Sequence, residues 1–169
     1  MNAKKLLDLK SSMNIFYLDK DPVKAAKIQY NKHVVKMPLE SAQMLCTAHH
    51  AVLGVDATVP YKVAHLNHPS SIWARTSKSN YMWLYNHFKA LASEYTARYG
   101  RTHLSWTKCH DILSSPPRGI PDIGLTKMPQ CMPDEYKTDC SIQAYWNYYI
   151  GEKHSVANPN KELIYDRRP

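Results

Sequence analysis

The clearest pattern of hydrophobic and polar positions lies between residues 77 and 100. Large apolar side chains recur there at spacings of three and four, the period of one buried face of an α-helix. They are Tyr81, Leu84, Tyr85, Phe88, Leu91, Ala92, Tyr95 and Tyr99. Ser77 is a typical N-cap, and Gly100 is a typical residue to end a helix. The pattern predicts one long amphipathic helix in which Tyr85 and Phe88 are buried.

Signals for helix initiation also occur near the N-terminus. The short apolar run at 13–18 predicts either a strand or an extended lead-in. It is followed by Asp21 and Pro22, and these are favoured as the N-cap and as the first helical residue. We therefore expect a helix that starts at Pro22 and continues through Tyr30.

Pro38 lies within the pattern that follows. A proline inside a helix removes one backbone hydrogen bond and clashes with the preceding turn. We expect a kink or a fresh helix start at this point, and then a helix over 39–53. Gly54 is suited to end that helix.

The remainder of the chain predicts loops and shorter helices. We expect a loop over 55–71, a short helix over 103–113, and a last helix that Asp134 caps and that runs to Tyr149. The segment 114–133 contains five prolines and two glycines. It is predicted to be irregular, and long irregular segments in compact domains are often functional.

Together these elements predict an all-α protein, a compact single-domain bundle of about four to five helices with long Pro-rich loops. The helical domain is expected over 13–153, between an N-terminal extension at 1–12 and a polar C-terminal tail at 154–169. No apolar run approaches the roughly 18 residues that a membrane span needs, and no signal-peptide pattern is present. We expect a cytoplasmic protein with no membrane partner, in an infected host cell if a phage encodes it.

The charge balance favours a polyanionic partner. The formal net charge is +8, and the chain has 12 tyrosines and 4 tryptophans. A basic surface with many flat rings suits DNA, which offers phosphates to neutralise and bases to stack on. The alternative is a soluble protein that is basic without such a partner, because net charge does not specify fold or function.

The cysteines predict neither a metal site nor a disulfide framework. Cys46, Cys109, Cys131 and Cys140 contain no CxxC pair, which argues against a zinc ribbon. Without an export signal the thiols are expected to be reduced. Cys46 falls on an apolar helix face and is expected in the core. We expect no bound metal and no cofactor.

A polar stripe around the proline is the most informative feature for function. His33, Lys36, Glu40 and Gln43 are spaced so that they line one face of a continuous helix. The neighbouring apolar residues should then point toward the core: Val34, Val35, Leu39 and Met44. The alternative is an ordinary solvated face with a weak Lys36–Glu40 ion pair.

Lysines precede and accompany this stripe. Lys20, Lys24 and Lys27 are spaced for one helical face, and Lys32 and Lys36 follow. Such a ridge can neutralise DNA phosphates, although a solvated lysine face explains the same spacing.

Three short motifs, taken in order, carry a resemblance to a known family. The first is the spacing of His33 and Glu40. The second is the run from His68 through Trp73, Tyr81, Leu84, Leu91 and Glu94 to Arg98, Tyr99 and Gly100, and the third is the segment 146–153. Together they span roughly residues 20 to 153, and they resemble the pyrimidine-dimer DNA glycosylase/AP lyases of the phage endonuclease V type.

The resemblance implies a DNA-binding protein that removes damaged pyrimidines. Glu40 would stabilise the positive charge that develops at the sugar C1′, His33 would move a proton, and Lys36 is the nearest candidate amine for a Schiff base. The implied partner is double-stranded DNA that is damaged or modified. Its expected contacts are Lys20, Lys24, Lys27, Lys32, Gln43, His68, Arg98, Trp146, Tyr148, Tyr149 and Lys153.

This chain departs from that family at its N-terminus. Family members use their own terminal amine as nucleophile, on a residue just before the first helix. Here about eighteen residues precede the equivalent point near Asp19. If the chain begins at Met1, that amine must fold back to reach Glu40, or another amine must act, or the lyase activity is absent.

Two further functions are compatible with the sequence. One is a metal-dependent hydrolase, with Glu40 or Asp111 as a carboxylate ligand and imidazoles drawn from His49, His50, His65, His68, His87, His103 and His110. The other is a non-catalytic phage protein that coats DNA or grips a host enzyme. The missing nucleophile favours this second alternative.

Overall fold

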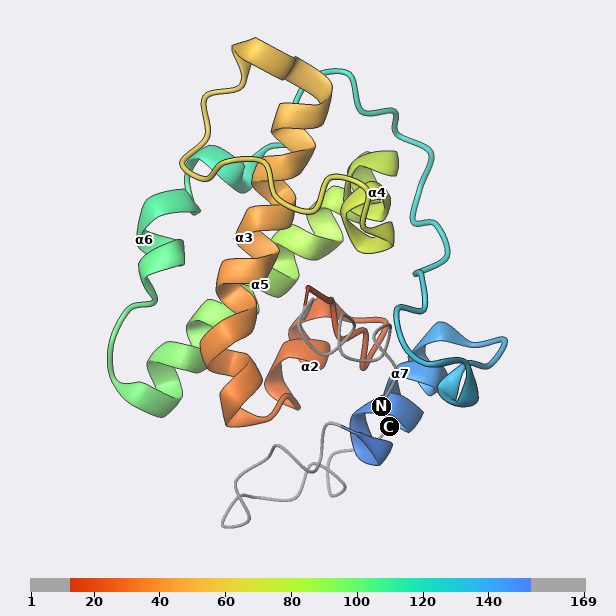
Figure 1. Cartoon of the computed structure of the whole chain (residues 1–169). Helices are drawn as coiled ribbons and strands as arrows, with labels where there is room; N and C mark the ends of the chain where they lie inside the picture. The colour runs from red at the N-terminus through yellow and green to blue at the C-terminus, as the bar shows by residue number, and fades with distance from the viewer. Residues whose placement is uncertain (1–12, 153–169) are drawn as a thin grey trace, which may run out of the picture.

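A computed structural model describes residues 13–152 of the chain (Figure 1). These residues form a bundle of α-helices with no strand, which confirms the all-α single-domain prediction. The α-helices are α2 (Pro22–Lys27), α3 (Asn31–Leu53), α4 (Pro69–Thr76), α5 (Lys78–Tyr99), α6 (Leu104–Cys109) and α7 (Ser141–Gly151). Three 3-10 turns accompany them: η1 (Gly54–Asp56), η2 (Ile112–Ser114) and η3 (Asp134–Tyr136). The extension at 1–12 and the tail at 154–169 lie outside the described residues.

The two long helices α3 and α5 pack against each other at the centre of the bundle (Figure 1). α2 packs on α5, α4 packs on both long helices, and α6 lies along α3. α7 lies beside the segment 13–18. The Trp146 indole N–H on α7 donates to the Leu18 carbonyl at 2.8 Å. Among residues 13–152, no helix combines the length and the apolar character needed to cross a bilayer.

The helix over 78–99 agrees closely with its sequence pattern. The Ser77 hydroxyl accepts the Ser79 N–H at 3.3 Å, and Gly100 ends the helix at a φ of 71°. Phe88 and Tyr85 are buried, as predicted, and the Tyr85 hydroxyl donates to the His110 carbonyl at 2.6 Å. The apolar stripe does not stay buried to its end, because Tyr99 is 41% exposed.

The N-terminal half breaks at a different place from the predicted one. Asp21 caps α2 through a 2.9 Å bond to the Val23 N–H, as predicted, but α2 ends at Lys27 and the chain turns before α3 begins at Asn31. The fresh helix start that was the alternative to a kink at Pro38 does not occur, since α3 runs through this residue. Pro38 lacks the N–H that would bond to the Val34 carbonyl. One residue further on, the His103 ring Nε2 lies 2.9 Å from the Val35 carbonyl.

Three shorter elements also differ from the predictions. The region expected as a loop to residue 71 contains the start of α4, which His68 caps through a 3.1 Å bond to the Ser70 N–H. The helix expected over 103–113 is only α6, followed by the turn η2. Asp134 begins the turn η3 and does not cap the last helix, which starts at Ser141.

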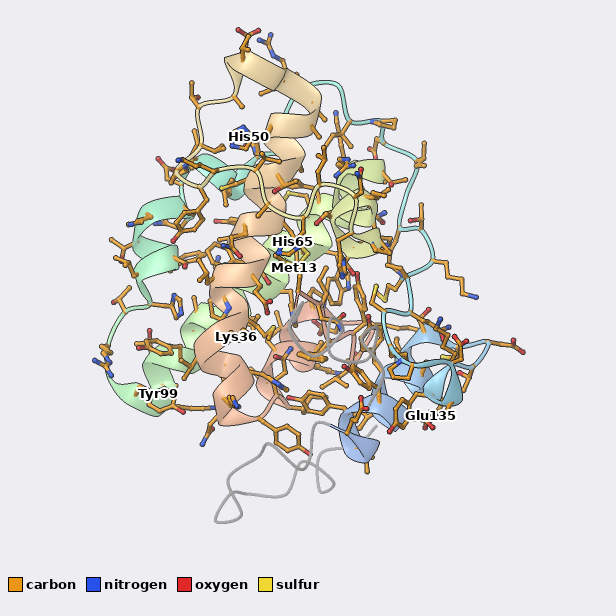
Figure 2. The ribbon with its side chains drawn as sticks, viewed as in Figure 1. Met13, Lys36, His50, His65, Tyr99 and Glu135 are labelled. Carbon is orange, nitrogen blue, oxygen red and sulfur yellow. The ribbon has the colours of Figure 1, made fainter. Side chains whose placement is uncertain are left out.

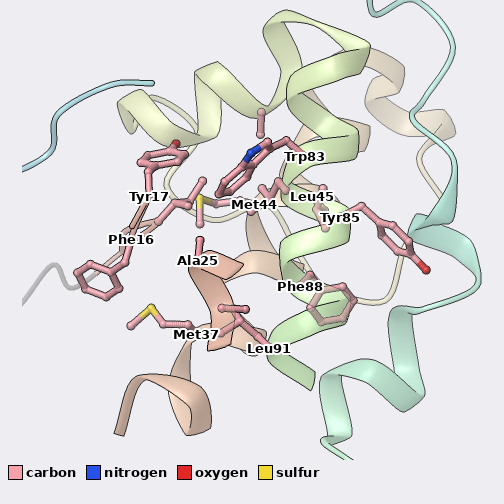
Figure 3. Close-up of a cluster of buried hydrophobic side chains, with 14 of the residues drawn as sticks. Phe16, Tyr17, Ala25, Met37, Met44, Leu45, Trp83, Tyr85, Phe88 and Leu91 are labelled. Atoms are coloured by element: carbon pink, nitrogen blue, oxygen red, sulfur yellow. The ribbon is translucent and has the colours of Figure 1, made fainter. Parts of the chain in front are cut away.

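The segment 13–18 is an extended lead-in, and it lies in the core rather than on the surface. Tyr17 is fully buried and packs edge-on against Trp73 and Tyr145, at ring-centroid distances of 5.3 and 5.2 Å. Figure 3 shows Phe16 and Tyr17 beside the buried side chains of α2, α3 and α5. The apolar run thus contributes side chains to the core that helices alone would not supply.

His87 on α5 is a buried imidazole whose two nitrogens both have partners. Its Nδ1–H donates to the Pro22 carbonyl at 2.9 Å, and its Nε2 accepts from the Gln29 amide at 3.2 Å. The ring also stacks on Trp83 at 5.0 Å. Burial is the main cause that lowers the pKa of His87, to about 4.

This arrangement predicts a loss of stability in acid. The pKa of His87 is about 4 in the folded chain and about 6.5 for an ordinary histidine, so the unfolded chain binds the proton more tightly. The free energy of unfolding should therefore fall by about 3 kcal/mol as the pH drops from about 6.5 to about 4. Urea titrations across this range measure the slope.

His87→Asn is the matched variant, because its amide nitrogen can still donate to the Pro22 carbonyl but does not titrate. Its free energy of unfolding should depend much less on pH over the same range. Some slope should remain, because burial also lowers the pKa of His49 and of His68. An unchanged slope in the variant would contradict this explanation.

Candidate functional site

The predicted catalytic pair lies on one face of α3, and both members are buried. His33 is 5% exposed and Glu40 is 6% exposed. Seven residues at about 100° each bring the two side chains to within roughly 20° around the helix, about 10 Å apart along its axis. The spacing argument is therefore correct, but this face is turned into the protein rather than toward solvent.

His33 is held by an aromatic cluster that joins the start of α3 to α7. Its Nδ1 lies 2.7 Å from the Tyr149 hydroxyl, and its ring stacks on Phe16 at 4.5 Å. The Tyr149 hydroxyl also accepts the Tyr30 N–H at 2.8 Å, and the two tyrosine rings stack at 4.6 Å. We call Phe16, Tyr30, His33 and Tyr149 the aromatic cluster.

The Tyr149 hydroxyl orients the His33 ring. It accepts the Tyr30 N–H and contacts His33 Nδ1, and a hydroxyl group can take part in both bonds. Burial raises the pKa of Tyr149 well above its usual value, so the phenol stays protonated. An imidazole can move a proton, and a buried carboxylate can stabilise developing positive charge.

The two other members of the polar stripe lie at its edge. Lys36 is exposed, and Gln43 is partly exposed. Lys36 is offset from Glu40 by about 40° around the helix, and it precedes it by about one turn. Figure 2 labels Lys36 on the lower half of α3.

The apolar residues beside the stripe divide between core and surface. Val34 and Met44 are buried, as predicted, but Val35 and Leu39 are 44% and 38% exposed. The expectation that all four point to the core is wrong for these two. The reason is that His33 and Glu40 occupy part of the buried face, so the opposite side of the first turns of α3 is left to solvent.

The five predicted lysine contacts are all exposed. Lys20 lies just before α2, Lys24 and Lys27 lie on α2, and Lys32 and Lys36 lie on the first turns of α3. Lys20 precedes Pro22, so it does not share the α2 face as predicted. The segment 22–39 contains no aspartate or glutamate, whereas Asp19 and Asp21 flank Lys20. We call these five residues the lysine face.

The aromatic rings predicted to contact DNA are part of the core. Trp146, Tyr148 and Tyr149 are all buried, and the Trp146 indole and the Tyr149 hydroxyl are used in the hydrogen bonds described above. A ring that stacks on a base needs an exposed face. Their predicted role in DNA contact is therefore replaced by a role in packing. Lys153 lies outside the described residues.

Two other predicted contacts have structural partners within the chain. Arg98 on α5 donates to the carbonyls of Lys27 and Gln29 and to the Asn31 side chain, at 3.0, 2.8 and 2.8 Å. It also pairs with Glu94 at 3.1 Å. His68 uses its Nδ1 to cap α4. Arg98 thus fixes the turn between α2 and α3, where the sequence pattern predicted a continuous helix.

The histidines do not assemble a metal site within residues 13–152. No group of three or more His, Cys, Asp or Glu side chains in this part of the chain is placed to hold a metal ion. His49 bonds to the Tyr81 hydroxyl at 2.9 Å, and His50 bonds to the Tyr61 carbonyl at 2.8 Å. The geometry of the described residues gives the metal-dependent hydrolase no support.

Sequence reasoning missed two features near the lysine face. Tyr99 was assigned to a buried stripe, and Arg101 was not singled out, yet both are exposed. The available signal was the position of Gly100, since residues next to a helix end often lose the cover of neighbouring helices.

The comparisons with known proteins found no match to this chain. No family model matches the chain, and no curated protein or solved structure matches it either. The resemblance to the pyrimidine-dimer glycosylases therefore stays a prediction.

Proposed function

We propose that this protein binds DNA through the lysine face. The observation that carries the proposal is the row of exposed lysines along 20–36, on a chain with a formal net charge of +8. DNA presents a regular line of phosphates, and each lysine that approaches one releases condensed counterions. A helix–turn–helix segment with five exposed lysines suits this kind of partner.

Salt dependence tests this proposal. Fluorescence anisotropy with a labelled 20-base-pair duplex should give an affinity that falls linearly with salt on a double-logarithmic plot, with a slope of about −4 for four to five phosphate contacts. The absence of DNA binding at low salt, or binding with a salt slope near zero, would disprove the proposal.

A second candidate is the base-excision reaction that the resemblance implies. The supporting observation is that Glu40 is buried two turns from a hydrogen-bonded His33, with Lys36 one turn away. The burial of Glu40 also counts against it, because a nucleotide must open the protein beside α3 to reach the carboxylate. Of the two candidate functions, we therefore favour non-catalytic DNA binding over the lyase.

Borohydride trapping separates the two candidates. An amine that attacks C1′ of an abasic deoxyribose forms an imine with loss of water, and borohydride reduces that imine to a stable secondary amine. A covalent protein–DNA adduct supports the lyase. Binding without an adduct supports the non-catalytic protein.

If the lyase candidate is correct, Glu40→Gln should abolish cleavage of damaged DNA and leave affinity for undamaged duplex within about twofold, because the lost charge acts only on the reacting sugar. Single-turnover cleavage and anisotropy measure the two quantities. Gln43→Glu is a control for charge on the same helix. Cleavage at the wild-type rate by Glu40→Gln would remove Glu40 from the site.

A further inference from the structure

The exposure of Tyr99 separates it from the other aromatic residues that the structure describes. Every other tryptophan, tyrosine and phenylalanine between residues 13 and 152 is buried or only partly exposed, whereas Tyr99 is 41% exposed. Behind it, the Tyr95 ring packs against Tyr99 at 5.3 Å and edge-on against His103 at 4.8 Å. Tyr99 therefore exposes its ring to solvent while Tyr95 packs against it from the protein side. This exposure is unusual among the described residues, because most of their aromatic rings are buried.

Two sets of hydrogen bonds tie this ring to the lysine face. Arg98, the residue before Tyr99, bonds to Lys27, Gln29 and Asn31 at the junction of α2 and α3. On its other side, His103 bonds to the Val35 carbonyl on the first turns of α3. The segment 98–103 is thus fastened alongside the part of α3 that carries Lys32 and Lys36. Figure 2 shows Tyr99 and Lys36 in the same region of the molecule.

Charge adds to this arrangement. The segment 95–110 contains no aspartate or glutamate, and Glu94 just before it is paired with Arg98 at 3.1 Å. Arg101 is exposed, two residues after Tyr99. The joined surface therefore combines cations for phosphates with one flat ring, and this combination is typical of sites that hold unpaired bases.

We infer that Tyr99 is a stacking platform for an unpaired base, with Lys32, Lys36 and Arg101 along the adjoining phosphates. The inference rests on the proposed DNA binding and deepens it, because it names the form of nucleic acid that the surface selects. A paired base inside a duplex offers no free face to a side chain, whereas a single strand or an extruded base does. The protein should bind a single strand more tightly than the duplex of the same sequence.

The test compares two labelled probes of equal charge by fluorescence anisotropy. One is an oligothymidylate of twenty nucleotides, and the other is a chain of twenty abasic sugar phosphates. Tyr99→Ala should weaken binding of the oligothymidylate about tenfold, which is typical of one lost stacking contact, and should leave binding of the abasic chain unchanged. Tyr99→Phe keeps the ring and should bind both probes as the wild type does. Lys32→Gln should weaken both probes.

The outcomes separate the inference from the proposed function. If Tyr99→Ala binds oligothymidylate as tightly as the wild type while Lys32→Gln binds it more weakly, the stacking platform is disproved and the lysine face stands. If the wild type binds neither probe nor duplex, both are disproved. Photo-crosslinking with 5-iodouracil in the oligonucleotide, followed by peptide mass spectrometry, should place the adduct on Tyr99. An adduct confined to other residues would overturn the assignment.

Discussion

Replacing the five residues of the lysine face with glutamine should reduce the affinity for duplex DNA more than 100-fold at about 0.1 M salt. The reason is that each lysine that contacts a phosphate adds about one to the magnitude of the salt slope. The slope of the variant should therefore be smaller in magnitude by about four to five. Glutamine has nearly the helix propensity of lysine, so α2 and α3 should persist. Anisotropy across a series of salt concentrations measures both quantities.

The matched control removes the same number of charges elsewhere. Lys62, Lys78, Lys89, Arg118 and Lys127 are all exposed and lie outside the lysine face. Their joint replacement by glutamine gives the same net charge, and its salt slope should stay within about one of the wild-type slope. Equal losses in the two variants would show that net charge, rather than the surface along α2 and α3, determines binding.

Phe88→Ala should destabilise the fold by about 3–5 kcal/mol, the usual cost of deleting a fully buried aromatic side chain. Phe88 is 0% exposed and packs against Tyr85 and Trp106 at ring-centroid distances of 6.2 and 5.4 Å. The Trp106 contact joins α5 to α6, so the cavity would lie between two helices. A loss of this size is a large part of the stability of a typical domain, about 5–15 kcal/mol. Urea unfolding at neutral pH measures it.

Tyr99→Ala on the same helix is the control for this substitution. It removes a ring of similar size from an exposed position, so its cost in stability should be about 0.5 kcal/mol or less. A loss below about 1 kcal/mol for Phe88→Ala would contradict the assignment of α5 as the central buried helix.

The parts of the fold that the sequence predicted correctly depend on local chemistry. The period of α5, its Ser77 cap and its Gly100 end are all encoded within one segment, as is the start of α2 at Asp21. The break between α2 and α3 is not local. It is fixed by Arg98, which reaches the turn from α5, and by the Tyr149 hydroxyl, which takes the Tyr30 N–H. No window of sequence around residues 28–30 contains these partners.

The candidate site shows the same division. The spacing of His33 and Glu40 predicted a shared helix face, and helix geometry alone is enough to place them together. The direction of that face could not be predicted, because it depends on which elements pack against α3. A polar stripe suggests solvent, yet Phe16 and Tyr149 cover His33 while Val35 and Leu39 are exposed. The exposure of Tyr99 likewise reflects where neighbouring helices end.

The most direct test of DNA binding by the lysine face is a map of the lysines that DNA shields from acetylation. Free and DNA-bound protein are treated with an amine-reactive acetylating reagent, and mass spectrometry measures the rate at each lysine. Lys24, Lys27, Lys32 and Lys36 should react more slowly in the complex, while Lys62, Lys89 and Lys127 should react at the same rate in both samples. Protection of the second group, with the first group reacting at its rate in the free protein, would contradict the proposed surface.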